Sequence, residues 1–584
     1  MKSLRRPTRF QIVALVVALG GMTFVLNTAL SQQSSDWPQW GQDPQHTGTV
    51  NVAAQNLNQV LADIVYDPFV AQEKAPENGD GDLLIHYQTP LVDGNNVYME
   101  FKTGTYTSIN TWETQIWNEK KLSWVGGNLV EQWNFQSDWK PVPYGSASWE
   151  PVFHATLAGD FVYVPGAGGT VYKISKAAGA VIAHYSPIGP DIDHNIFETG
   201  PITADSGGNI YYNVLKLNLS NPWGKDVIGA WLVKVTASGT VSSAQFKDIM
   251  TGEMGPNDDC EVGFGSPPPW PPTPTSVAPT RKCGAVRPGI NVAPAVAPDG
   301  TIYTIARNHF VTRYGSLVAV NSNLTPKWTA SMHGVLNDGC NVQIPPNGTP
   351  GGCSIGATTG VAPDTNSLPS GRILDDSSSS PVVAPDGSII YGSYTAYNYL
   401  QGHLLHYSST GQFLNSYIFG WDDTPGIYSH GGTYSVVTKD NHYNTGSYCG
   451  DPNVCPPDRT ASNPGYPEEY FVTQLSPTLT VEWRYKNTNM FACTRQPNGS
   501  VTCDDGTAHP HSFEWCVNAP AIDSAGVVYA NSEDGNLFAI NQGGTLKQKI
   551  FQQLAIGAAY TPASIGGDGK IYSQNDGHLY VVGN

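Results

Sequence analysis

A short pattern that recurs along this 584-residue chain constrains its fold more than any other feature. It is clearest in residues 518–546, where three apolar runs, 519–522, 527–530 and 537–540, are separated by turns rich in Gly, Asp and Asn. Short β-branched and aromatic runs between such turns are typical of an antiparallel β-meander. One meander cannot bury both faces of its sheet, so further copies are expected to pack against it.

The copies are present along the whole chain. The pattern begins eight times, near Gln88, His154, Thr199, Asn291, Ser379, Gly432, Asn518 and Tyr560. In each copy a strand ending in Tyr is followed by a strand of the form G-x-L-x-x-(I/V/L), and a further strand follows, as in 326–328. Four antiparallel strands per unit, repeated eight times, predict an all-β fold, an eight-bladed β-propeller.

The last copy stops after its third strand, because the chain ends at Asn584. An unassigned strand pattern near the front of the chain, 57–66, can supply the missing fourth strand. An N-terminal strand that completes the C-terminal blade would close the ring and leave no exposed sheet edge between the ends.

Composition excludes one large class of function. Charged residues make up 13% of the chain, against the usual quarter or so. The 48 acidic and 30 basic residues give a formal net charge of −18. Nucleic-acid binding requires a Lys/Arg-rich face, and no such stretch is visible. The acidity is interpreted as solubility outside the cell.

The N-terminus carries a targeting segment. Basic residues Lys2, Arg5, Arg6 and Arg9 precede an apolar run at 12–26 and small residues at 27–31. This order predicts a secretory signal peptide over 1–31 that leaves no stable membrane span after cleavage, with an uncleaved anchor as the alternative. Residues 32–584 are then one propeller, secreted or periplasmic.

The cysteines support export. Eight of the nine lie in pairs close in sequence, which predicts four disulfides. The pairs are Cys260–Cys283, Cys340–Cys353, Cys449–Cys455 and Cys493–Cys503. They fall within or at the edges of loop insertions near 255–290, 333–372, 444–469 and 486–511. Cys516 is left over and is interpreted as a buried, inert thiol.

The repeats resemble those of a known family. The clearest motifs are 169–172 (GTVY), 535–541 (GNLFAIN) and 577–580 (GHLY), and the stretch 36–48 (DWPQWGQDPQHTG) is similar to the start of many of its members. The chain therefore resembles PQQ-like, or quinoprotein-type, β-propellers. This family includes quinone-dependent dehydrogenases and non-catalytic propellers of outer-membrane protein assembly, so the resemblance implies the fold without fixing the activity.

The chain departs from both branches of this family. The alcohol dehydrogenases hold pyrroloquinoline quinone (PQQ) beside a ring formed by two adjacent cysteines, and no two cysteines are adjacent here. Their docking Trp in the fourth strand is found only at Trp328 and Trp483. The non-catalytic lipoprotein relatives carry a lipid-bearing Cys, which this chain lacks after its apolar run. We therefore assign no cofactor ligand and no metal site to this chain from the family resemblance.

Residues that enter the innermost strands are expected to ring the mouth of the central channel. These candidates are Tyr87, Gln88, His154, Glu198, Asn291, Ser378, His430, Asn518 and Tyr560. Glu198 and Asn291 could supply oxygen ligands to a Ca²⁺ ion beside a quinone. The favoured interpretation is that the ring groups satisfy one another and ordered water.

Two functions are compatible with the sequence. The favoured hypothesis is a non-catalytic binding or scaffold protein without a cofactor, whose insertions contact a protein or glycan partner. The alternative is a PQQ- and Ca²⁺-dependent periplasmic dehydrogenase that oxidises an alcohol or sugar, with a carboxylate as the base.

Overall fold

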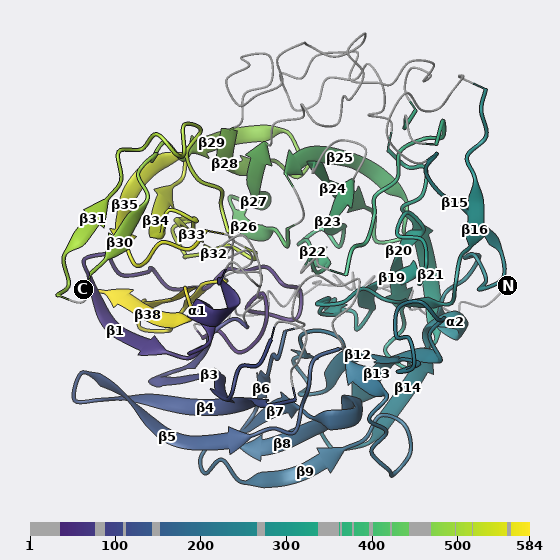
Figure 1. Ribbon diagram of the computed structural model, residues 1–584, viewed down its shortest axis with the longest axis horizontal. Helices are drawn as coiled ribbons and strands as arrows, with labels where there is room; N and C mark the ends of the chain where they lie inside the picture. Colours follow the sequence, from purple (N-terminus) through teal and green to yellow (C-terminus); the bar gives the residue numbers. More distant parts are fainter. Residues whose placement is uncertain are drawn as a thin grey trace, which may run out of the picture. The chain divides into compact units, whose positions relative to one another are not determined.

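The computed structural model confirms the eight-bladed propeller (Figure 1). It describes residues 36–75, 88–108, 113–142, 152–264, 275–336, 361–362, 365–375, 379–395, 401–420, 423–442, 469–496, 498–516, 518–556 and 562–584. Residues Ser34–Asn584 form one compact unit. Within the described residues, no helix is long and apolar enough to cross a membrane.

Each blade is an antiparallel sheet of four successive strands, named A to D from the channel outward. Blades 1 to 4 consist of β2 (Leu91–Asp93), β3 (Asn96–Gly104), β4 (Gln115–Val125) and β5 (Asn128–Gln136); β6 (Thr156–Ala158), β7 (Phe161–Pro165), β8 (Val171–Ser175) and β9 (Val181–Tyr185); β10 (Ile196–Glu198) with β11 (Thr203–Ala204), β12 (Ile210–Lys216), β13 (Gly229–Val235) and β14 (Val241–Gln245); and β17 (Val286–Pro288) with β18 (Ala295–Val296), β19 (Ile302–Asn308), β20 (Gly315–Val320) and β21 (Pro326–Ser331).

Blades 5 to 8 repeat this order. They consist of β22 (Val382–Val383), β23 (Ile389–Thr395), β24 (Gln401–Tyr407) and β25 (Phe413–Gly420); β26 (Gly426–His430), β27 (Thr433–His442), β28 (Glu469–Leu475) and β29 (Val481–Lys486); β32 (Ala521–Ile522), β33 (Val528–Asn531), β34 (Asn536–Asn541) and β35 (Thr545–Phe551); and β36 (Ser564–Ile565), β37 (Ile571–Asn575), β38 (His578–Gly583) and β1 (Gln59–Val65).

The fourth strand of blade 8 comes from the front of the chain. β1 pairs antiparallel with β38, from Gln59 opposite Gly583 to Val65 opposite His578. The sequence-predicted pairing of an early strand with the last blade is therefore observed. Figure 1 shows this strand beside the C-terminus.

Burial explains why these segments are strands. Every residue of β19 and β20 is buried, because both faces of a middle strand pack against neighbouring blades. The outer strand β35 instead consists of exposed and half-buried residues. Apolar clusters accordingly lie between adjacent blades, and the largest joins blades 7, 8, 1 and 2.

Tryptophans on outer strands dock onto the next blade. Trp133 of β5 donates its indole N–H to the carbonyl of Lys176, 3.0 Å away, and packs on Gly179. Trp328 of β21 does the same at Ser409 and Gly411. A Cβ on Gly179 would lie 2.7 Å from the Trp133 ring, so the glycine is required for contact as well as for its positive φ. Trp133 extends the docking pattern that the sequence showed only at Trp328 and Trp483.

The strand order makes the two faces of the propeller different. Turns from A to B and from C to D are short, such as 94–95 and 431–432, and all lie on one face, here called the tight-turn face. Connections from B to C and from D to the next A lie on the opposite face, here called the loop face. The four predicted insertions are all connections of this second kind.

Two predicted disulfides are present on the loop face. Cys260–Cys283 joins the hairpin of β15 (Asp259–Glu261) and β16 (Thr280–Lys282). Cys493–Cys503 joins the hairpin of β30 (Cys493–Arg495) and β31 (Val501–Cys503). Cys516 is a buried free thiol, as predicted, and burial raises its pKa well above the ordinary value. The other two predicted pairs, Cys340–Cys353 and Cys449–Cys455, lie outside the described residues.

Candidate functional site

The channel is lined at the tight-turn end by residues 36–55, here called the N-terminal segment. Its backbone hydrogen-bonds to A strands around the ring: Leu157 N–H donates to Pro38, Val296 to Pro44, Val383 to Gln45, Ile427 to Thr47 and Ile522 to Gly48. Trp37 exchanges two such bonds with Val92, and Gln55 N–H donates to Gly569. In blade 3 the Ala204 N–H donates to the Gln39 side chain.

This segment hydrogen-bonds along the inner edges of blades 1 to 7 and reaches blade 8 at the turn that follows its A strand. A strand edge presents unpaired N–H and C=O groups, and buried backbone groups need partners. Because the A strands consist of only two to five paired residues, one chain crossing the channel can reach each of them. The sequence comparison used residues 36–48 only as a family resemblance and missed this structural role.

His46 lies at the centre of the N-terminal segment. Its Nδ1 is 2.9 Å from the Pro381 carbonyl in blade 5, and its Nε2 is 3.3 Å from the Thr203 hydroxyl in blade 3. The residue is fully buried and has φ +62°. Burial lowers the pKa of His46 to about 4, so the imidazole is neutral at neutral pH.

At the loop end, polar residues that precede the A strands join blades to one another. Asn291 donates its backbone N–H to the Thr199 carbonyl at 2.6 Å and accepts the Val152 N–H at its side-chain oxygen, 2.8 Å away. Asn518 accepts the Thr424 N–H in the same way at 2.8 Å. These two predicted ring residues therefore act as inter-blade contacts.

Glu198 is the one carboxylate among the predicted ring residues, and it is buried. Its Oε2 accepts the Trp139 indole N–H at 3.1 Å, and its Oε1 accepts the Gly200 N–H at 2.7 Å. Trp139 packs edge-on against Trp117 with ring centroids 5.1 Å apart. Burial raises the pKa of Glu198 well above its ordinary value, although the two N–H groups act in the opposite direction.

His154 and Gln88 retain unsatisfied polar atoms. His154 Nδ1 lies 2.7 Å from the Ala155 carbonyl, while its Nε2 has no hydrogen-bond partner among the described residues. The side-chain amide of Gln88 is likewise unpartnered within that part of the chain. Burial lowers the pKa of His154 to about 3, and its ring stands edge-on to Trp40 at 5.6 Å. Such buried atoms are the usual partners of ordered water.

The structure places one predicted residue, His430, differently. His430 ends β26 at the Gly431–Gly432 turn, so it lies on the tight-turn face, and Thr424 takes the expected place before the A strand of blade 6. The sixth copy was predicted to begin at this turn, so its A strand was predicted too far along the chain. His430 Nε2 contacts the Ser435 hydroxyl at 2.8 Å. Tyr87, Ser378 and Tyr560 lie outside the described residues.

The described residues do not fit a quinone and Ca²⁺ site at Glu198 and Asn291. Both oxygens of Glu198 and the side-chain oxygen of Asn291 accept N–H bonds that hold the surrounding chain. A cation there would have to share these oxygens with the N–H groups that they already accept. No group of three His, Cys, Asp or Glu side chains with the arrangement of a metal site occurs within the described ranges.

Similarity to known proteins is found among solved structures. No protein-family model matches the sequence, and no curated protein matches it. Among solved structures, a europium-containing methanol dehydrogenase is 12% identical with a TM-score of 0.46, covering 93% of this chain and 90% of its own. A quinohemoprotein alcohol dehydrogenase from Comamonas testosteroni is 11% identical with a TM-score of 0.48, covering 95% and 81%.

BamB from Moraxella catarrhalis is also similar, with 11% identity, a TM-score of 0.37 and coverage of 90% of this chain and 99% of its own. Both kinds of protein named by the repeat resemblance, dehydrogenases and a BamB propeller, are thus among the similar structures. At these identities and scores the likeness carries no conclusion about activity. The fold assignment rests on the strand topology of the chain itself.

Proposed function

We propose that this chain is a secreted or periplasmic propeller that binds a protein or glycan partner through its loop face and does not catalyse a redox reaction. The observation that carries the proposal is the asymmetry of the two faces. The tight-turn face has short connections and an N-terminal segment beneath it, whereas both described disulfide hairpins lie on the loop face. Recognition surfaces of rigid scaffolds are commonly built on such loops.

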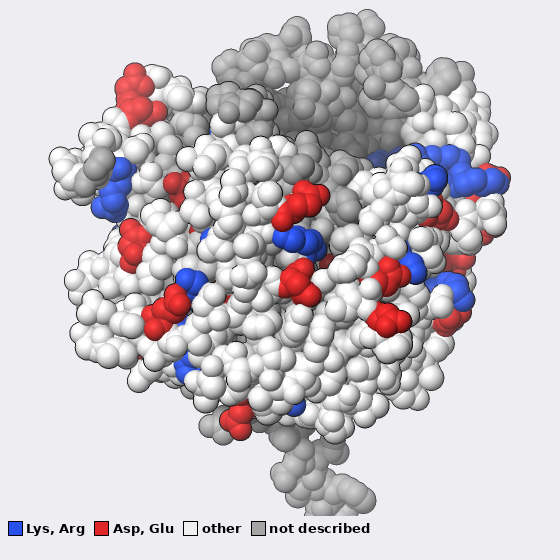
Figure 2. All heavy atoms as spheres, turned by 60° about the horizontal axis from the view of Figure 1, so that its bottom comes forward, with Lys and Arg blue, Asp and Glu red and all other residues white. Residues whose placement is uncertain are grey.

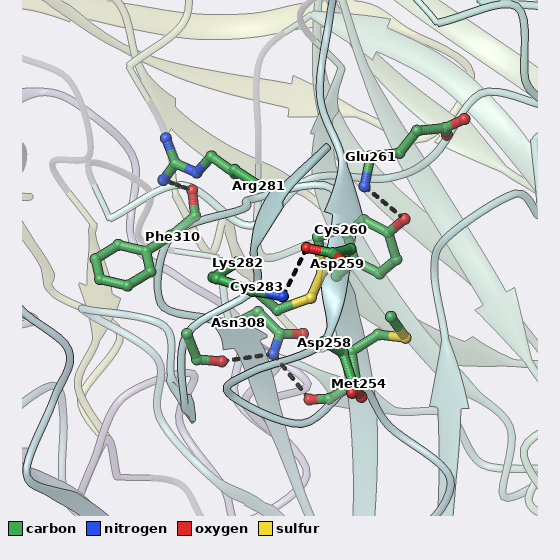
Figure 3. The surroundings of a disulfide bond; sticks show 12 residues. Met254, Asp258, Asp259, Cys260, Glu261, Arg281, Lys282, Cys283, Asn308 and Phe310 are labelled. Atoms are coloured by element: carbon green, nitrogen blue, oxygen red, sulfur yellow. Dashed lines mark hydrogen bonds and ion pairs between the residues drawn. A yellow bond between two sulfur atoms is a disulfide. The ribbon is translucent and has the colours of Figure 1, made fainter. Parts of the chain in front are cut away.

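The β15–β16 hairpin is held in a fixed position on blade 4 (Figure 3). Besides its disulfide, Glu261 N–H donates to the Tyr314 hydroxyl at 3.0 Å. Asn308 anchors the flanking chain through the carbonyls of Met254 and Gly284, at 3.0 and 2.9 Å. A loop held by these contacts loses less conformational freedom on binding than an unrestrained one.

The β30–β31 hairpin borders a second feature of the loop face. A hollow of ≈ 200 Å³ is lined by Lys486, Asn487, Thr488, Met490, Pro510, His511 and Ser512. Beside it, Met490 and Phe491 are 40% and 46% exposed. Exposed apolar side chains at the rim of a polar hollow suit a protein side chain or a sugar ring.

The surface also fits a role outside nucleic-acid binding. Figure 2 shows a mostly uncharged face on which acidic and basic side chains lie beside one another. No large patch of a single charge sign is seen in that view. This distribution agrees with a charged content of 13% and favours recognition by shape and hydrogen bonds over long-range electrostatic attraction.

Two measurements test the proposal. The purified chain is mixed with PQQ and Ca²⁺, and its absorption spectrum and dye reduction are followed with a panel of alcohols and sugars. We expect no saturable cofactor binding and no turnover, and saturable binding with turnover would establish the dehydrogenase instead.

In parallel, a glycan array and candidate envelope proteins are screened for saturable binding, which a Phe491→Ser change should weaken. Leu546→Ser, at a tight turn of blade 7, is the matched control.

A further inference from the structure

A buried lysine and two carboxyl groups meet where the ends of the ring come together. Lys102 lies on β3 of blade 1, and Asp67 follows β1, the outer strand of blade 8. Glu73 ends the short helix α1 (Val70–Glu73). Lys102 Nζ is 3.0 Å from Asp67 Oδ2 and 3.6 Å from Glu73 Oε1.

The site is closed to solvent. The Lys102 and Asp67 side chains are both 0% exposed, and the Glu73 side chain is 3% exposed. The backbone holds the pair in register, because Lys102 N–H donates to the Tyr66 carbonyl at 2.8 Å and the Asp67 side chain accepts the Phe69 N–H at 3.0 Å. The amine and the carboxyl carbon therefore have little freedom to separate.

The carboxyl groups around Lys102 are close together. The Lys102 ammonium group faces the carboxyl groups of Asp67 and Glu73, and Glu100 is buried nearby on the same strand as Lys102. The pKa of Tyr66 is raised by burial and by these same carboxylates, which shows how closely they are grouped.

We propose that Lys102 and Asp67 form an intramolecular amide (isopeptide) bond, with Glu73 as the proton-transfer group. An amine held against a carboxyl group, away from water, has the proximity that makes an intramolecular reaction fast. Exclusion of water also protects the amide from hydrolysis. Buried ion pairs often contribute little to stability, so conversion of the pair to a neutral amide removes a desolvation cost.

The reaction balances without any co-reactant. The Lys102 ammonium gives one proton to Glu73 and its nitrogen attacks the carboxyl carbon of Asp67. Glu73 returns the proton to the departing oxygen, the C–O bond breaks, and the nitrogen loses its second proton to that oxygen. One N–C bond forms and one molecule of water leaves.

The position of the bond gives it a structural use. It would join the chain behind β1, which pairs with the last strand β38, to β3 of the first blade. The bond would close a loop in this part of the chain and hold β1, the strand that pairs with β38, against blade 1. This covalent tie is independent of any partner or substrate, so its test is separate from that of the proposed function.

Mass spectrometry of the reduced, denatured protein tests the proposal. We expect a mass lower by one water than the sequence requires, loss of tryptic cleavage after Lys102, and a branched peptide joining Lys102 to Asp67. Lys176 and Asp93 provide a control within the same molecule, since their ion pair has a similar 2.8 Å distance but is 19% and 38% exposed. That pair should remain unlinked. A full-mass protein with separate Asp67 and Lys102 peptides would refute the bond.

Variants assign the roles. Lys102→Met and Asp67→Ala should restore the full mass expected for each sequence. Asp67→Asn should still form the amide but lose ammonia in place of water. Glu73→Gln should leave most molecules unlinked, and unchanged linkage in that variant would show that Glu73 has no part in the reaction. Because the wild-type mass alone decides whether the bond exists, a variant that fails to fold does not obscure the result.

Discussion

The two ends of the central channel are built from different kinds of interaction. At the tight-turn end, backbone groups of the N-terminal segment meet backbone groups of the A strands around the ring. At the loop end, side chains such as those of Asn291 and Asn518 join the blades, and atoms of Gln88 and His154 are unpartnered among the described residues. Backbone pairing completes the sheets at one end, and side-chain hydrogen bonds join the blades at the other.

We propose that this difference separates stability from recognition. Backbone contacts depend little on the identity of the side chains, so the tight-turn end can hold the ring while the loop end varies. Both described disulfides lie in two-stranded hairpins that are separate from the blade sheets. The following predictions test this division, from the largest effect to the smallest.

Deletion of residues 36–55 should abolish folding. Ten backbone hydrogen bonds join this segment to the blades, and at about 1 kcal/mol each their loss is comparable with the whole stability of a typical domain, roughly 5–15 kcal/mol. The measurement is soluble yield and cooperative thermal unfolding. Deletion of residues 2–31 is the control and should leave unfolding unchanged. A soluble, cooperatively folding 36–55 deletion would show that the segment is dispensable.

Replacement of Trp40 by Ala should lower the free energy of unfolding by about 3–5 kcal/mol, because a fully buried indole is removed. Trp40 is 1% exposed and contacts His154. Phe491→Ala on the loop face should cost less than about 0.5 kcal/mol. Urea unfolding of both variants measures the two losses in free energy of unfolding. Equal losses would contradict the proposed difference between the two ends.

Acid should loosen the tight-turn end first. The folded-state pKa of His46 is lowered by burial to about 4, below the ordinary 6.5, so its stabilising contribution is complete above pH 6.5 and is lost as pH falls toward 4. The shift corresponds to about 3 kcal/mol. His46→Asn, a residue tolerated at positive φ, should reduce the pH dependence of unfolding between pH 7 and 4. Replacement of the exposed His194 by Gln should leave this pH dependence unchanged. Identical pH profiles for wild type and His46→Asn would contradict the assignment of the pH dependence to His46.

Removal of the Cys260–Cys283 disulfide should have the smallest global effect. A 23-residue separation stabilises by about 3 kcal/mol at most in the chain-entropy treatment. Because the hairpin lies outside the blades, we expect the loss to remain local in the Cys260→Ser, Cys283→Ser variant. Hydrogen exchange should increase in β15 and β16 with little change in β19 and β20. Faster exchange throughout blade 4 would show that the hairpin supports the blade.

Much of the fold was readable from local sequence. Gly turns, short apolar runs and Tyr-ending strands identified the eight blades and the early strand that joins the last blade. The spacing of the cysteines identified the two described disulfides. Each of these signals extends over a short stretch of sequence. The position of His430 was misjudged because the sixth copy diverges and its Gly431–Gly432 turn resembles the start of a repeat. Thr424, the residue that occupies the expected place, has no local signal beyond its polarity.

The sequence by itself determined the repeating unit, the number of blades and the asymmetry of loop lengths, because strand propensity and turn residues act over short distances. Only the tertiary structure decided that residues 36–55 run along the inner edges of blades 1 to 7, that Glu198 and Asn291 accept neighbouring N–H groups, and that Lys102 meets Asp67 and Glu73. Those contacts join residues separated along the chain, and they arise when the ring brings its inner edges and its two ends together.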